Sequence, residues 1–199
     1  MNISIFGLGY VGCVGAACLA KLGHEVIGVD VNENKVRLIN EGKPTIIEDG
    51  IAELCAEAHS KGLMTATLDV RQAVHATDVS FIVVGTPSSK EGHLNLNYIY
   101  KVAEQIGAAL KDKFETINHQ SSISSTLRHI IAIRSTVLPG TNERVGEIIE
   151  EASGLKRGVD FTIVSNPEFL REGTSVKDYF NPPLTLVGTD MPEAEVLLP

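Results

Sequence analysis

Several features that define specialised protein classes are scarce or missing in this sequence. Tryptophan is absent, and only three cysteines occur among 199 residues, at Cys13, Cys18 and Cys55. They show no C-x-x-C spacing and fall in segments of helical composition, which favours buried thiols over ligands or disulfides. No apolar run approaches the ~20 residues that span a bilayer, and the start of the chain carries no basic signal-peptide region. We therefore expect a cytoplasmic protein that does not enter the membrane.

Positive charge is also in short supply. Seventeen Lys and Arg residues stand against 25 Asp and Glu, a formal net charge of -8. An acidic chain without a basic run repels a phosphate backbone, so a nucleic acid is not an expected partner. The six histidines, His24, His59, His75, His93, His119 and His129, show no ligand spacing, and we expect no metal site. A hydrophobic content of 43% is typical of an ordinary globular domain.

The pattern that is present alternates apolar strand-like runs with helical segments. Strands are expected at 3–6, 25–29, 79–84, 129–134, 161–164 and 184–187. Helices are expected at 10–22, 33–40, 51–60, 70–75, 96–110 and 141–152, with Asn32 and Asp69 as caps of two of them. Strands that are apolar on both faces and separated by helices predict an α/β fold of the Rossmann type: a doubly wound, mainly parallel six-stranded sheet with helices on both faces. The polar, Ser/Thr-rich stretch at 116–126 predicts a long exposed loop.

A glycine-rich hexapeptide follows the first expected strand. It consists of Gly7, Leu8, Gly9, Tyr10, Val11 and Gly12, a G-x-G-x-x-G pattern. In a dinucleotide site Gly7 permits the tight turn, Gly9 lets the backbone approach the pyrophosphate, and Gly12 allows close packing of helix on sheet. Tyr10 and Val11 open the helix whose N-terminal amides face the phosphates. A purely structural turn is the alternative, but the strand, the glycines, the helix and the following acid occur in the order and at the spacing of a dinucleotide-binding motif.

That acid is Asp30, which ends the second expected strand. Its spacing from Gly12 is close to the ~20 residues typical of the carboxylate that binds the adenosine ribose. A carboxylate there favours NAD over NADP because it would repel a 2′-phosphate, and no arginine follows it. Lys35 lies one turn into the next helix, where it can reach the ribose or simply face solvent.

Two carboxylates four residues apart, Glu168 and Glu172, suggest acid–base chemistry. On one face of a helical turn they can hold a water molecule and move protons. A structural reading competes with this one, because Asn166 and Pro167 resemble a helix cap with proline at the first helical position.

Four motifs in order give the chain a family resemblance. They are GLGYVG at 7–12, GTP at 85–87, RSTVLPGT at 134–141 and NPEFLREG at 166–173. Together they resemble the UDP-glucose/GDP-mannose dehydrogenase family over essentially the whole chain, and NPPLT at 181–185 looks like the GDP-mannose branch. UDP-glucose or a UDP-aminosugar remains an alternative substrate.

The resemblance implies functions for particular residues. Such enzymes oxidise the C6 alcohol of a nucleotide sugar to a carboxylate with two NAD+, through a thioester on a catalytic cysteine. Thr86 and Pro87 would contact NAD, and a turn that merely ends a strand is the alternative explanation. Thr136 would lie near the nicotinamide and help to position water. Glu172 would approach the substrate C6, with Glu168 as its partner.

The resemblance also implies that part of the enzyme is missing. Family members are considerably longer, and their second half carries a catalytic lysine and a cysteine in a Gly-Gly-x-Cys setting, neither of which occurs here. We therefore interpret 1–199 as the NAD-binding domain of a longer dehydrogenase that shares its nucleotide-sugar substrate with the second half and forms a homodimer. None of the three cysteines is expected to act as the nucleophile. The alternative from another class is a stand-alone NAD(H)-binding regulatory module.

Overall fold

The computed structural model describes residues 1–88, 93–120 and 129–191. Its strands are β1 (Asn2–Phe6), β2 (Glu25–Val29), β3 (Met64–Thr67), β4 (Val79–Ile82), β5 (His129–Ile133) and β6 (Phe161–Ser165). Its helices are α1 (Tyr10–Lys21), α2 (Glu33–Asn40), α3 (Ile51–Ser60), α4 (Val70–Ala76), α5 (Asn97–Gln120), α6 (Thr141–Ser153) and α7 (Ser175–Phe180). The alternation of strands and helices confirms the predicted α/β class.

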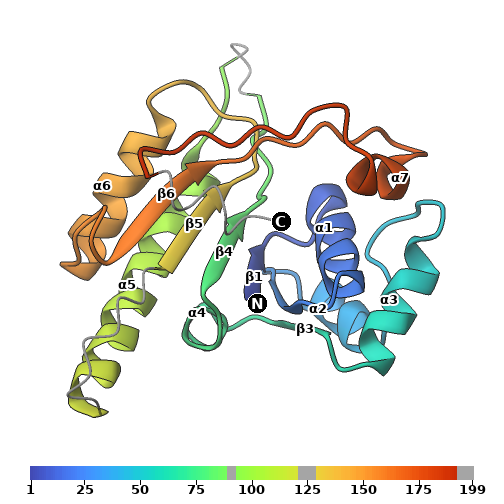
Figure 1. The fold of residues 1–199 in the computed structure, drawn as a ribbon, viewed down its shortest axis with the longest axis horizontal. Helices are drawn as coiled ribbons and strands as arrows, with labels where there is room; N and C mark the ends of the chain where they lie inside the picture. Colours follow the sequence, from blue (N-terminus) through green and yellow to red (C-terminus); the bar gives the residue numbers. More distant parts are fainter. Residues whose placement is uncertain (89–92, 121–128, 192–199) are drawn as a thin grey trace.

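The strands form one sheet in the order β3-β2-β1-β4-β5-β6 (Figure 1). Every neighbouring pair is parallel, and Phe6 at the end of β1 is in register with Val29 of β2 and Ile82 of β4. The chain runs outwards from β1 in one direction and then, from β4, in the other. This is the predicted doubly wound topology, and the reversal between β1 and β4 is the position where such sheets bind ligands.

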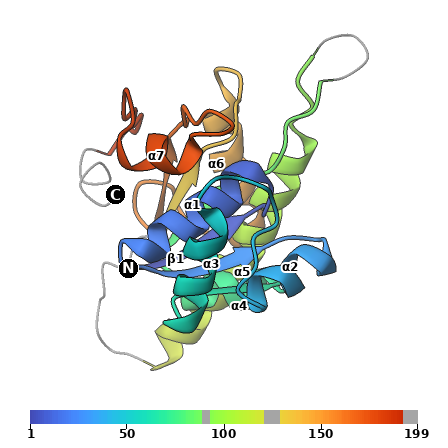
Figure 2. The same ribbon diagram turned by 90° about the vertical axis from the view of Figure 1, so that its right-hand side faces the viewer.

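Helices cover both faces of the sheet, as Figures 1 and 2 show. On one face α1, α2, α3 and α7 pack over the cluster that contains Ile5, and on the other α4, α5 and α6 pack over the cluster that contains Phe6. Neighbouring strand residues point to opposite faces, which explains why both must be apolar. Helix α1 is buried almost throughout, and its small glycine, alanine and cysteine residues let it lie close to the sheet.

One predicted strand is wrong and another was missed. Residues 184–187 form no strand; the segment makes only an isolated antiparallel bridge between Ser165 and Gly188. Leu184 is 54% exposed and Leu186 46%, unlike the buried residues of the central strands. The sixth strand is β3, in which only alternate residues are buried. Its sequence, MTAT, has too few large apolar side chains to stand out as a strand.

Helix α5 extends beyond its predicted end at 110. Residues 116–120, which were expected to begin a loop, continue the helix to Gln120, and the rest of that predicted loop lies outside the described residues. Two tertiary contacts hold the helix just past residue 110: Phe114 packs on the core, and Lys113 is buried with its Nζ donating to the carbonyls of Val74 (3.1 Å) and Thr77 (2.5 Å).

The two predicted helix caps are confirmed. The side chain of Asn32 accepts hydrogen bonds from the backbone amides of Asn34 (3.0 Å) and Lys35 (3.3 Å) at the start of α2. Asp69 accepts one from Gln72 (3.1 Å) at the start of α4. Each cap satisfies amides that the helix leaves without a partner.

A chain of buried polar side chains crosses the strands at their amino-terminal half. His129 Nε2 lies 2.8 Å from Ser80 Oγ, which lies 2.8 Å from Ser4 Oγ, and Thr77 Oγ1 donates to Ser4 Oγ at 3.1 Å. His129 Nδ1 has no partner among the described residues. Burial, followed by the positive charge of Lys113, lowers the pKa of His129 to about 3, so the ring is neutral in the folded chain.

Candidate cofactor site at the carboxyl ends of the strands

The predicted site residues all follow strands of the sheet. Gly7 follows β1, Asp30 follows β2, Thr86 lies beyond β4, Thr136 lies beyond β5, and Glu168 lies beyond β6. Because the strands are parallel, their carboxyl ends lie at one edge of the sheet, so the topology brings these residues to the same edge.

The three glycines of the hexapeptide occupy different environments. Gly7 has φ +106°, and a Cβ there would lie 3.0 Å from the carbonyl oxygen of Val83. A Cβ on Gly12 would lie only 1.8 Å from the carbonyl oxygen of Gly7, whereas one on Gly9 would meet nothing within 4 Å. The tight turn at Gly7, the close packing at Gly12 and the open approach at Gly9 match the geometry expected for a pyrophosphate loop.

The N-terminus of α1 is suited to an anion. Gly9 is its N-cap, no side chain caps it, and no acidic residue lies in the first turn. The N-terminal amides of Tyr10 and Val11 therefore face the open space above Gly9 without competition from a carboxylate. Amides and helix dipole together favour a phosphate there, so the loop fits a dinucleotide.

Asp30 is held by three donors. Oδ2 accepts from the Leu8 amide (2.7 Å) and from Lys35 Nζ (3.2 Å), and Oδ1 accepts from the Asn32 amide (2.9 Å). Burial raises the pKa of Asp30, but these hydrogen bonds outweigh it and keep the pKa below its usual value. A carboxylate offers roughly four acceptor positions, so one remains for a ribose hydroxyl. Next to it Val31 is 95% exposed.

The two threonines lie on loops that contact each other. Ser135, between β5 and Thr136, donates its hydroxyl to the carbonyl of Val84 (2.7 Å), two residues before Thr86. Thr136 is exposed and Thr86 is half-buried. Pro87 accepts a hydrogen bond from the Asn95 amide (2.9 Å), which fixes the strand-ending turn. The structure thus joins the two loops at the cofactor edge of the sheet.

The predicted helical turn around Glu168 and Glu172 does not form. Asn166 caps no helix; its side-chain amide donates to the carbonyl of Leu186 (3.0 Å). Glu168 Oε2 accepts from the amide of Leu170 (2.6 Å), and helix begins only at Ser175. The two carboxylates therefore do not share a helix face, because the segment uses its polar groups in local and tertiary bonds. Glu172 is exposed in a turn before α7.

Glu48 joins two segments of the candidate site, a contact that the sequence analysis did not predict. Its Oε2 accepts from the Tyr10 hydroxyl (2.6 Å) and the Gly173 amide (2.9 Å), and its Oε1 accepts from the Ser175 amide (2.9 Å). These hydrogen bonds, that from Tyr10 first, lower the pKa of Glu48 to about 2. No local pattern signals the role, because Tyr10 and Gly173 are both far from Glu48 in the sequence.

The remaining expectations concern the three cysteines, a metal site and membrane-spanning helices. Cys13, Cys18 and Cys55 are free and fully buried, as predicted, so none is accessible to a substrate. Within residues 1–88, 93–120 and 129–191 there is no cluster of three or more potential metal ligands. No helix in the same part of the chain has the length and apolarity needed to cross a membrane.

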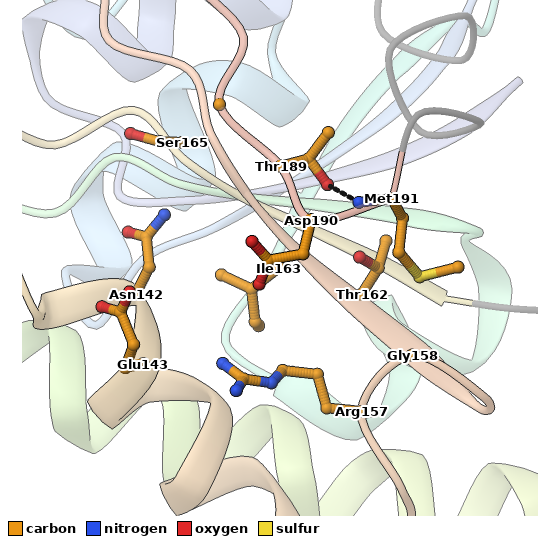
Figure 3. A pocket seen from close by; sticks show the side chains of 11 residues that line it. Asn142, Glu143, Arg157, Gly158, Thr162, Ile163, Ser165, Thr189, Asp190 and Met191 are labelled. Atoms are coloured by element: carbon orange, nitrogen blue, oxygen red, sulfur yellow. Dashed lines mark hydrogen bonds between the residues drawn. The ribbon is translucent and has the colours of Figure 1, made fainter.

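A separate hollow of about 470 Å³ lies beside the edge strand β6 (Figure 3). Asn142 and Glu143 of α6, Arg157 before β6, and Asp190 line part of it. Acidic and basic side chains face it together, and none of the residues predicted for the cofactor lines it. The hollow is therefore separate from the residues that the sequence predicts for the cofactor.

The doubly wound sheet and the uncapped glycine-rich helix start define a dinucleotide-binding domain. The chain belongs to the UDP-glucose/GDP-mannose dehydrogenase family, whose NAD binding domain matches residues 1–198. Its cofactor is therefore NAD, as predicted from Asp30, and the family resemblance is confirmed.

Individual members of the family are similar to this chain in sequence and in structure. The chain is 51% identical over 189 residues to GDP-mannose 6-dehydrogenase of Pseudomonas aeruginosa, covering 94% of this chain and 41% of the relative. It is 38% identical over 191 residues to UDP-glucose 6-dehydrogenase of Rhizobium meliloti, covering 96% of this chain and 40% of the relative. A ternary-complex crystal structure of the Pseudomonas aeruginosa GDP-mannose dehydrogenase superimposes with a TM-score of 0.90 at 48% identity, covering 99% of this chain and 43% of that one. The chain thus spans about two-fifths of these relatives.

Proposed function

We propose that this chain is the NAD-binding domain of a dehydrogenase that oxidises the C6 alcohol of GDP-mannose to the uronate. The observation that carries the proposal is the 51% identity to GDP-mannose 6-dehydrogenase, against 38% to UDP-glucose 6-dehydrogenase. The chemistry supplied by NAD+ is acceptance of a hydride. As the family resemblance implies, the complete reaction consumes two NAD+ and passes through a thioester on a cysteine outside this chain, since its own cysteines are buried.

The strand ends supply the cofactor contacts in this proposal. Gly7, Gly9 and Gly12 shape the loop, while the amides of Tyr10 and Val11 bind the pyrophosphate. The remaining contacts come from the other strand ends: Asp30 and Lys35 bind the adenosine ribose, Thr86 and Pro87 contact the cofactor, and Thr136 lies towards the nicotinamide. The support is geometric: the N-terminus of α1 is uncapped, and Asp30 is held ionised beside the loop.

The acidic residues supply the proton chemistry. We assign Glu172 to the substrate C6, because its side chain is exposed in the turn before α7. Glu168 is a weaker candidate, since one carboxylate oxygen already accepts from the Leu170 amide. Thr136 assists by holding water beside the cofactor. The nucleotide sugar is shared with the part of the enzyme outside this chain, which we expect to form a cytoplasmic homodimer and to be needed for activity.

Titration of the chain with NADH and, in parallel, NADPH tests the cofactor part of the proposal. The absence of tryptophan leaves the nicotinamide fluorescence free of that background. Saturable NADH binding with much weaker NADPH binding is the expected result, and equal binding of both would contradict the role of Asp30. A stand-alone regulatory module would bind NADH equally well, so the substrate requires an activity assay. The protein from the complete reading frame should reduce NAD+ with GDP-mannose faster than with UDP-glucose.

A further inference from the structure

Glu172 lies in a turn that is fixed from both sides by carboxylates of other segments. On its N-terminal side the guanidinium of Arg171 bonds to Asp178 of α7, with Nη2–Oδ1 at 2.7 Å and Nε–Oδ2 at 3.0 Å. On its C-terminal side the amides of Gly173 and Ser175 both donate to Glu48, at 2.9 Å each. The backbone that carries Glu172 is thus held, while its own side chain stays exposed.

Glu48 also reaches the cofactor loop. The hydroxyl of Tyr10, the first residue of α1, donates to Glu48 Oε2 at 2.6 Å. Burial first, and then the hydrogen bond that Tyr10 donates to Glu48, raise the pKa of Tyr10. One carboxylate joins the helix start that faces the pyrophosphate to the turn that presents Glu172.

The three donors around Glu48 explain why this position is an ionised glutamate. Both oxygens of Glu48 act only as acceptors, Oε1 for the Ser175 amide and Oε2 for the Gly173 amide and the Tyr10 hydroxyl. A glutamine amide has one acceptor oxygen and one donor nitrogen, so either orientation places an N–H group against an N–H donor. Among the described residues no Lys or Arg pairs with Glu48, so its link to the turn consists of these directed hydrogen bonds.

We propose that Glu48 is a positioning residue that holds Glu172 in register with the cofactor loop. Glu48 contacts neither substrate nor cofactor in this proposal; it acts through the backbone of the turn and through Tyr10. The inference rests on the proposed function, because it gives Glu172 the task described above. It adds a physical link between the cofactor half of the site and the group that serves the substrate.

The link itself is tested in the present chain by amide hydrogen exchange. In Glu48→Gln the amides of Gly173 and Ser175 should exchange at least fivefold faster, while the amides of β6 keep their rates. Glu53→Gln is the matched control, since it removes the same charge from the exposed side of α3 and should leave both amides unchanged. A smaller increase in Glu48→Gln overturns the proposal. This readout does not depend on any activity, so it separates failure of the link from failure of the proposed function.

The functional consequence is tested in the protein from the complete reading frame. Glu48→Gln should lower kcat at least fivefold while changing the NADH dissociation constant less than threefold. In a protein that already carries Glu172→Gln, adding Glu48→Gln should lower kcat less than twofold, because the effects of residues that act as a unit do not add. A purely structural role predicts an equal loss in both backgrounds, or a parallel loss of NADH affinity, and either result overturns the proposal. Tyr10→Phe, which cuts only the tie to α1, gives a second variant if Glu48→Gln does not fold.

Discussion

The buried histidine at the start of β5 makes the stability of the domain depend on pH. His129 is neutral in the folded chain, with a pKa near 3, whereas an unfolded histidine titrates near 6.5. Below pH 6.5 the unfolded chain binds a proton that the folded chain does not bind, so the unfolded state gains stability. The stabilisation relative to the unfolded chain is therefore complete above pH 6.5 and is lost progressively as the pH falls towards 3.

The size of the effect follows from these two values. Each pH unit below 6.5 costs about 1.4 kcal/mol for one proton, so at pH 5 the loss amounts to about 2 kcal/mol. His129→Gln removes the titrating ring but keeps a polar group within reach of Ser80, its hydrogen-bond partner. The variant is less stable at pH 7, because it loses the packing of the ring, but it should lose less stability on acidification.

Urea unfolding followed by far-ultraviolet circular dichroism at pH 7, 6 and 5 measures this difference. All other titrating groups are common to the two proteins and cancel when the variant is subtracted from the parent. The difference in unfolding free energy should shrink by about 2 kcal/mol between pH 7 and 5. A difference that stays constant within about 0.5 kcal/mol would refute the reasoning, because it would mean that His129 titrates normally in the folded chain.

Three further predictions concern the cofactor loop and the core. Asp30→Ala should weaken NADH binding roughly tenfold or more, because it removes a charged hydrogen-bond partner, and should narrow the difference in affinity between NADH and NADPH. Unchanged affinities for the two coenzymes would exclude Asp30 as the residue that binds the ribose. Gly12→Ala places a methyl group 1.8 Å from a loop carbonyl, so NADH binding should be lost and the unfolding free energy should fall by about 1–3 kcal/mol. Gly15→Ala is its control, since a Cβ there meets only one atom at 4.0 Å, and it should bind NADH like the parent. Lys113→Met leaves the carbonyl of Thr77 without the Lys113 donor, while the carbonyl of Val74 keeps only the Thr77 amide at 3.4 Å. The substitution should therefore cost about 1–3 kcal/mol in urea unfolding, whereas exposed Lys111→Met should cost almost nothing.

Local signals made much of the fold predictable. The capping residue Asn32, the glycines around Tyr10 and the apolar strand before Gly85 act within a few residues of their own positions. Short-range patterns of this kind determine where helices and strands begin and how the sheet is covered. The alternation of strands and helices predicted the doubly wound, parallel sheet, but not the strand β3 at its edge.

The features that were not predictable depend on contacts between distant segments. Helix α5 continues past residue 110 because Lys113 reaches carbonyls near α4. The turn that carries Glu172 replaces an expected helix because Glu48 and Asp178, each on another element or loop, take up its donors. For the same reason Glu48 itself carried no signal: its partners are 38 and 125 residues away along the chain.

The hydrogen bond from the Leu8 amide to Asp30 bears on attempts to change coenzyme preference. Replacing the acid to admit a 2′-phosphate would also remove one of two acceptors that hold the glycine-rich loop beside β2, the other being the carbonyl of Val29. An NADP-dependent descendant of this domain therefore needs two changes together: a cationic group for the extra phosphate, and a new acceptor for the loop amide. A variant that gains only the cationic group would bind the extra phosphate but lose the hydrogen bond that orders the loop. Such a variant would therefore gain little in NADP binding.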